Sequence, residues 1–172
     1  MTSTDLISRT PEEKTLLQDA TSQDQSSEPT ELSLDDAIRY AMSLHRNQQL
    51  EGAEMLYRRI LEHVPGQPDV LHHLGLARYQ RGHPLEAIEL IGAAVEQVPG
   101  FADYHANLAN IYLSEGRLEE AMASCRQAIR LEPGRADFHN NFGVLLRALG
   151  QPQAAESAYR RAIELDPGHF RA

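Results

Sequence analysis

The chain has 172 residues, a length that suits one globular unit, and 41% of them are hydrophobic. The formal net charge of −9 is spread over the first 33 residues and the remainder, which argues against nucleic-acid binding. Cys125 is the only cysteine, no run of about 18 apolar residues occurs, and the start lacks the basic and apolar regions of a secretion signal, so we expect a cytoplasmic protein without membrane insertion.

Residues 1–33 are rich in Ser, Thr, Gln and acidic residues and contain few large apolar ones. Such a segment cannot bury enough surface to offset the entropy of ordering, so we predict a disordered acidic tail. Within it, Thr10-Pro11-Glu12-Glu13 has the capping pattern of a short helix that would run to about Ala20. The sequence leaves open whether that segment only frays in solvent or folds onto a partner.

A period of 34 residues organises the rest of the chain. It places prolines at Pro65, Pro99, Pro133 and Pro167. It also aligns alanines at Ala53, Ala87, Ala121 and Ala155, and small residues at Ala41, Gly75, Ala109 and Gly143. The period divides residues 34–169 into four units, 34–67, 68–101, 102–135 and 136–169, and leaves 170–172 as the stub of a would-be next repeat.

Each unit has the apolar spacing of two amphipathic helices. In 102–135, Leu108, Ile111 and Tyr112 recur at steps of three and four residues, and a similar run begins at Leu118, after Gly116. The pattern predicts helices over about 34–47, 50–63, 68–81 and 84–97, with later turns at 115–117 and 149–151. Proline at the end of each unit cannot continue a helix, so each unit is expected to be a helical hairpin.

These aligned columns resemble the tetratricopeptide repeat, which has this length and this order of Leu, Gly, Ala and Pro. The resemblance implies an all-α fold, a right-handed α-solenoid of four helix-turn-helix repeats. It also implies that the first helices of the repeats line a concave groove in which extended peptides bind. The chain departs from the family pattern at Gln48, where glycine is usual, and at Arg78, where tyrosine is usual. The second departure predicts that the second unit is the weakest link in the stack.

The expected groove residues come from the sixth position of the units, which holds Arg39, His73, Asn107 and Asn141. The two asparagines resemble the asparagine ladder in the tetratricopeptide arm of bacterial O-linked N-acetylglucosamine transferase-like proteins, where amides pair with a peptide backbone. Flanking positions add further candidates: Asn110, Asn140, His72, His45, Tyr79 and Arg147. Asp103 and Asp137 also belong to the expected face, although an Asp near a helix start more often serves the cap and the helix dipole.

The sequence gives no sign of catalysis. Its eight histidines lack the spacing of a metal site, and His105 and His139 occupy a column expected to pack. Cys125 falls in a core column, and no phosphate-binding loop or nucleophile motif occurs. We therefore expect no enzyme activity, no metal and no cofactor.

The most favoured function is a non-catalytic scaffold that binds a partner protein or extended peptide in the groove. One alternative is the substrate-recruiting arm of a larger glycosyltransferase-like or sulfotransferase-like enzyme. Another is an end-to-end assembly module, because the last unit carries an apolar stripe with no following helix to cover it. That end interface, expected to form a homo-oligomer, consists of Ala155, Tyr159, Ala162 and Ile163.

Overall fold

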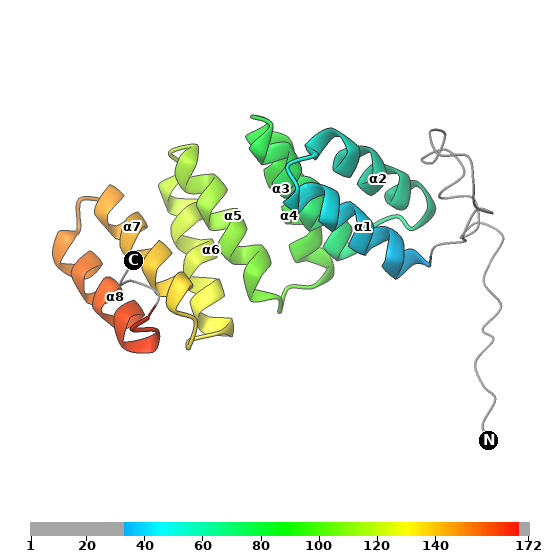
Figure 1. Ribbon diagram of the computed structural model, residues 1–172. Helices are drawn as coiled ribbons and strands as arrows, with labels where there is room; N and C mark the ends of the chain where they lie inside the picture. Colours follow the sequence, from blue (N-terminus) through cyan, green and yellow to red (C-terminus); the bar gives the residue numbers. More distant parts are fainter. Residues whose placement is uncertain (1–32, 169–172) are drawn as a thin grey trace, which may run out of the picture.

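The computed structural model describes residues 33–168, which form eight α-helices and no strand (Figure 1). The helices are α1 (Leu34–Arg46), α2 (Leu50–His63), α3 (Pro68–Gln80), α4 (Pro84–Gln97), α5 (Ala102–Ser114), α6 (Leu118–Leu131), α7 (Ala136–Ala148) and α8 (Pro152–Leu165). Residues 1–32 of the predicted tail, with its expected short helix, and the stub at 170–172 lie outside the described residues, whereas Ser33 is described and belongs to the start of α1. Within 33–168, no helix is long and apolar enough to cross a membrane.

Local sequence explains where the helices begin. Ser33 caps α1, because its hydroxyl accepts a hydrogen bond from the Asp36 amide at 3.2 Å. The Gln67 side chain does the same for α3, accepting from the Val70 amide at 2.8 Å. Proline opens α3, α4 and α8, where its missing amide proton costs nothing. The helices predicted over the first two units match the observed bounds to within one residue.

The turn inside each hairpin requires a left-handed backbone at one position. Gly82, Gly116 and Gly150 adopt it with φ of 82°, 71° and 72°. Gln48 holds the same position in the first hairpin with φ of 62°, although it has a Cβ. The first turn therefore keeps the geometry of the others at a cost of about 1 kcal/mol.

Small residues let the two helices of a hairpin approach closely. A Cβ at Gly75 would lie 2.6 Å from Cγ1 of Ile91, and one at Gly143 would lie 2.5 Å from Cε1 of Tyr159. Neither position has room for a side chain. The aligned small column thus sets how α3 packs on α4 and how α7 packs on α8.

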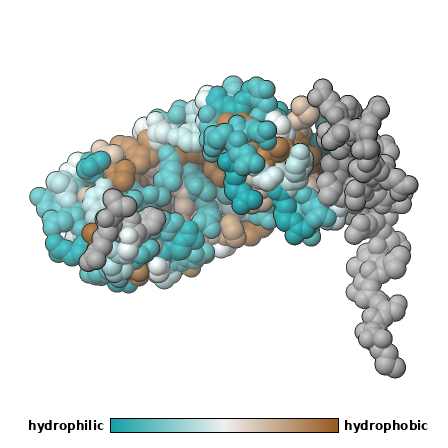
Figure 2. All heavy atoms as spheres, in the orientation of Figure 1, coloured by the Kyte–Doolittle hydropathy of each residue, from teal (hydrophilic) through white to brown (hydrophobic). Residues whose placement is uncertain are grey.

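The four hairpins stack in chain order into an elongated solenoid (Figure 1). The first helices α1, α3, α5 and α7 contact one another in sequence, and α2, α4 and α6 each contact the first helix of the following hairpin. The buried side chains form clusters that span the junctions between hairpins, such as Ile91 of α4 with Tyr104 and Leu108 of α5. The visible surface is mostly hydrophilic, with several hydrophobic patches (Figure 2).

Arg78, the residue behind the predicted weak link, makes ionic contacts at the junction between the first two hairpins, and the strength of that junction stays a prediction. Oε2 of Glu54, on α2, contacts the guanidinium groups of Arg58 at 3.2 Å, Arg78 at 3.3 Å and Arg81 at 3.1 Å. Arg78 also binds Glu86 at 2.7 Å, and this hydrogen bond lowers the pKa of Glu86. Arg78 therefore replaces the usual tyrosine with an ionic contact between hairpins.

Candidate peptide-binding face

The row of first helices α1, α3, α5 and α7 forms the first-helix face, where the sequence placed its binding residues. Asn107 and Asn141 hold the same position on α5 and α7, 34 residues apart. Their surroundings differ, however. The difference arises one position earlier in the preceding unit, which holds His72 below Asn107 and Ala106 below Asn141.

Asn107 is already engaged within the protein. Its Nδ2 lies 2.9 Å from Nε2 of His72 and donates a hydrogen bond to it. Burial, together with the charge of neighbouring His73, lowers the pKa of His72 to about 4, so the ring is neutral near pH 7 and can accept. Asn107 thus ties α5 to α3 and keeps its carbonyl oxygen and its second N–H for a ligand.

The other three amides of the face are unengaged. Asn110 is exposed, Asn140 and Asn141 are half-buried, and none of them hydrogen-bonds to another described residue. Each amide offers a carbonyl acceptor and an amino donor. We call these three residues on the neighbouring helices α5 and α7 the amide patch; they have unused hydrogen-bonding capacity.

The two aspartates of the predicted face are held across units by one arginine. Nη2 of Arg135 lies 3.0 Å from Oδ1 of Asp103 and 2.8 Å from Oδ2 of Asp137, and its guanidinium lies over the Phe138 ring at 4.3 Å. The hydrogen bond from Arg135 lowers the pKa of Asp137. Neither aspartate is a helix cap, since α5 and α7 begin after Phe101 and Arg135 with no side-chain cap. Their observed contacts join α5 to α7.

The remaining predicted groove residues do not lie together. His73 is half-buried, and its ring stacks on that of Tyr57 with 6.1 Å between centroids. Arg39 is exposed and pairs with Asp36 of its own helix. Tyr79 packs against the apolar cluster around α4 and α5, so much of its ring is unavailable. Arg147 lies at the end of α7, beside the hollow described next.

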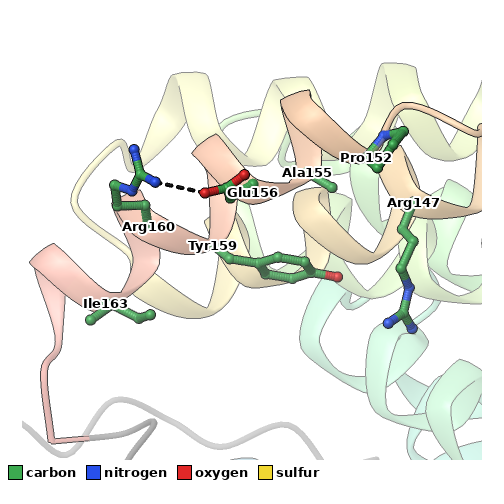
Figure 3. Close-up of a pocket in the computed structure, with 7 residues that line it drawn as sticks. All are labelled: Arg147, Pro152, Ala155, Glu156, Tyr159, Arg160 and Ile163. Carbon is green, nitrogen blue, oxygen red and sulfur yellow. Dashed lines mark hydrogen bonds and ion pairs between the residues drawn. The ribbon is translucent and has the colours of Figure 1, made fainter.

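A hollow of about 380 Å³ opens at the outer side of α8, lined by Arg147, Pro152, Ala155, Glu156, Tyr159, Arg160 and Ile163 (Figure 3). Arg160 and Glu156 pair with each other at 2.7 Å, and the Tyr159 ring lies between Ile163 and Arg147 (Figure 3). Ile163 is 49% exposed, whereas Ala162 is fully buried. Of the four expected end residues, Ala155, Tyr159 and Ile163 thus line the hollow, and Ala162 lies behind it.

A second hollow of about 380 Å³ lies between α1 and α3, and the sequence prediction named only His45 and His73 among its residues. Its other residues are Met42, Arg46, Gln48, Tyr57 and Gln80. The only available signal was Tyr57, whose position in the next two units is held by the smaller Ile91 and Cys125. A ring at that position can reach from α2 to the first-helix face.

The described residues offer no cluster for metal binding or catalysis. Among 33–168, no group of three or more His, Cys, Asp or Glu side chains could hold a metal ion. His105 and His139 instead contact the carbonyl oxygens of Pro99 and Pro133, each at 2.9 Å, which fixes the loops between units. Cys125 is buried, and burial raises the pKa of its thiol to about 11, so it remains protonated near pH 7.

Comparison with known proteins supports the fold. Two family models described as tetratricopeptide repeat match residues 73–136 and 112–172, which together span more than half of the chain. A crystal structure of MamA has a TM-score of 0.72 at 16% identity and covers 81% of each chain. The structure of residues 41 to the end of MamA from Desulfovibrio magneticus RS-1 has a TM-score of 0.72 at 16% identity. The match covers 80% of this chain and 78% of that chain.

TTC0263, a thermophilic TPR protein in Thermus thermophilus, has a TM-score of 0.70 at 23% identity and covers 78% of this chain and 75% of that chain. No curated protein sequence matches this chain at a significant level. At these identities the likeness is one of fold, and it confirms the predicted right-handed α-solenoid.

Proposed function

Because the chain belongs to the tetratricopeptide repeat family, we propose that it is a non-catalytic scaffold that binds an extended segment of a partner protein along its first-helix face. The observation that carries this proposal is the patch of unengaged amides, Asn110, Asn140 and Asn141, on α5 and α7. An exposed Asn in the middle of a helix lowers helix propensity and gives no packing in return. Paired donors and acceptors in a row suit the backbone of an extended peptide.

The test begins with a peptide array that identifies a binding segment, followed by calorimetry on the variant Asn110→Ala with Asn141→Ala. Each lost hydrogen bond is expected to weaken binding by about 1 kcal/mol, while melting stays nearly unchanged because neither amide has a partner in the chain. Gln153→Ala serves as the control, since it removes an exposed amide from the second helix α8. Equal affinity of the double variant and the wild type would refute the amide contact.

Asn107 is less suited to that test than its position suggests. Asn107→Ala would leave Nε2 of buried His72 without its partner, so a loss of binding could follow from a loss of packing between α3 and α5.

A second function, assembly of copies end to end, is favoured by the hollow on α8. The counterparts of Tyr159 in the earlier units are Tyr57, Ile91 and Cys125, and all are at most 3% exposed because the next hairpin covers them. Tyr159 packs against Gly143 of α7 and is half-buried, and no described hairpin follows to cover its outer side, which we propose is covered by a second copy of the chain. The substrate-recruiting arm of a larger enzyme stays a prediction that no described contact favours.

Light scattering over a range of concentrations tests the assembly. We expect the average mass to rise with concentration, and Ile163→Lys to abolish the rise, because this side chain is 49% exposed at the rim of the hollow. Leu85→Lys is the control, since Leu85 is 64% exposed on α4, away from the hollow. A wild-type chain that stays monomeric at its highest soluble concentration would rule the assembly out.

A further inference from the structure

The hollow between α1 and α3 contains a buried hydroxyl with no partner. Tyr57 is fully buried, and its hydroxyl makes no hydrogen bond with any described residue. A buried polar group without a partner is rare in folded proteins and calls for an explanation. Tyr57 lines the hollow, so a ligand there could supply the missing acceptor.

The other polar side chains of the hollow supply one guanidinium cation, together with amides and imidazole rings that can donate as well as accept. Arg46 contributes a guanidinium, Gln48 and Gln80 contribute amides, and His45 and His73 contribute ring nitrogens. None of the lining residues is acidic. A carboxylate is the ligand group that can accept from both a guanidinium and a phenolic hydroxyl.

The hydroxyl is closed to solvent, so an entering group must displace a side chain that lines the hollow. Met42 lines the hollow from α1 and is only half-buried. Its unbranched side chain has three rotatable bonds, so it can move aside at little cost. The aromatic residues are more firmly held, because the His73 ring stacks on Tyr57 and the His45 ring meets Tyr57 edge-on with 6.3 Å between centroids.

We infer that the hollow between α1 and α3 is a subsite for a carboxylate, which accepts hydrogen bonds from Tyr57 and Arg46 and comes from an acidic side chain of the bound segment. The inference rests on the proposed function for the source of the carboxylate, since the hollow lies on the first-helix face. An acidic residue of the partner would enter between the first two units, at the other end of the face from Asn140 and Asn141.

The test uses a small probe and needs no knowledge of the partner. N-acetyl-glutamate N-methylamide is titrated into the full chain while the histidine ring signals are followed by NMR, and the glutamine analogue serves as the uncharged control. We expect saturable shifts of His45 and His73 with the glutamate compound only. Tyr57→Phe should weaken its binding roughly tenfold, as expected for a lost hydrogen bond to a charged group.

The chain provides a matched control variant in Tyr159→Phe, which removes a hydroxyl from the same position of the last unit and should leave probe binding unchanged. Equal shifts with both compounds, or full affinity in Tyr57→Phe, would overturn the subsite. So would a clear drop in the melting temperature of Tyr57→Phe, because it would mean that the hydroxyl has a partner in the unoccupied protein. Probe binding that survives Asn110→Ala with Asn141→Ala would establish the subsite whatever the fate of the amide patch. The opposite result is that the wild type fails to bind the probe, while the double variant loses peptide binding. That result would leave the proposed function intact and remove the subsite.

Discussion

The ionic contact between the first two hairpins can be exchanged for an apolar one that the chain itself provides. Glu54 and Arg78 hold the positions that Met122 and Leu146 hold at the junction between the last two hairpins. There, Leu146 is buried and Met122 packs against its cluster. We therefore consider three variants: Glu54→Met, Arg78→Leu and the double variant. The double variant gives the first junction the two residues found at the junction between the third and fourth hairpins.

The exposures of the two side chains set the expected magnitude. The Glu54 side chain is 1% exposed and that of Arg78 is 12% exposed, and removal of one partner from a buried pair costs about 3–5 kcal/mol. Arg58 and Arg81 remain near Glu54 in Arg78→Leu, so we expect a loss of about 2 kcal/mol. Glu54→Met leaves Arg78 with Glu86, at a cost of about 1 kcal/mol. The double variant leaves no buried charge from this pair. Its free energy of unfolding should therefore lie within about 1 kcal/mol of the wild-type value, or exceed it.

Urea unfolding followed by far-ultraviolet circular dichroism measures these free energies and the coupling between the two sites. Glu156→Met is the matched control, because Glu156 holds the same position as Glu54 in the last unit but is 69% exposed, and its ion-pair partner among the described residues is Arg160. It should change stability by less than about 0.5 kcal/mol. If the double variant loses as much as the sum of the single ones, the contact is not a coupled ionic pair and the reasoning fails.

Two further predictions concern stability. Gln48→Gly should raise the free energy of unfolding by about 1 kcal/mol, because φ of 62° strains a residue with a Cβ; an unchanged melting temperature would contradict this. Acidification should destabilise the protein between pH 6.5 and pH 4, because burial lowers the pKa of His72 from 6.5 to about 4 and the unfolded chain takes up its proton first. The lowered pKa of His73 acts in the same direction. Below pH 4, the protonation of His72 should have lowered the free energy of unfolding by about 3 kcal/mol in total. Unfolding curves of wild type and His72→Gln at several pH values check it, since the variant should show the weaker dependence.

Much of the fold could be predicted because it depends on local sequence. Proline and glycine fix where helices end, and the apolar spacing fixes which side of each helix is buried. Gln48 was recognised as a departure, and the structure adds that it adopts the glycine conformation nonetheless. These features require only the residues of a single hairpin.

Contacts between units were harder to predict, since they depend on side chains that stacking brings together. Arg78 seemed a defect by comparison with the family pattern, yet Glu54, 24 residues earlier, supplies its partner. Asn107 and Asn141 looked equivalent by position, but only Asn107 lies next to a histidine of the preceding unit. The sequence pattern thus located the face but not which of its side chains were already in use.

The polar contacts between units also determine where on the first-helix face a ligand finds free groups. Tyr104 donates to Asp69 at 2.5 Å and Asn107 donates to His72, so polar groups shared by α3 and α5 are occupied. Arg135 occupies the aspartates at the start of α5 and α7, which leaves the amides in the middle of these helices free. Free donors remain at the two ends of the row, in the hollow between α1 and α3 and in the amide patch on α5 and α7. Because one end suits a carboxylate and the other suits a peptide backbone, a segment that uses both must place its acidic residue between the first two units, which fixes its position along the face.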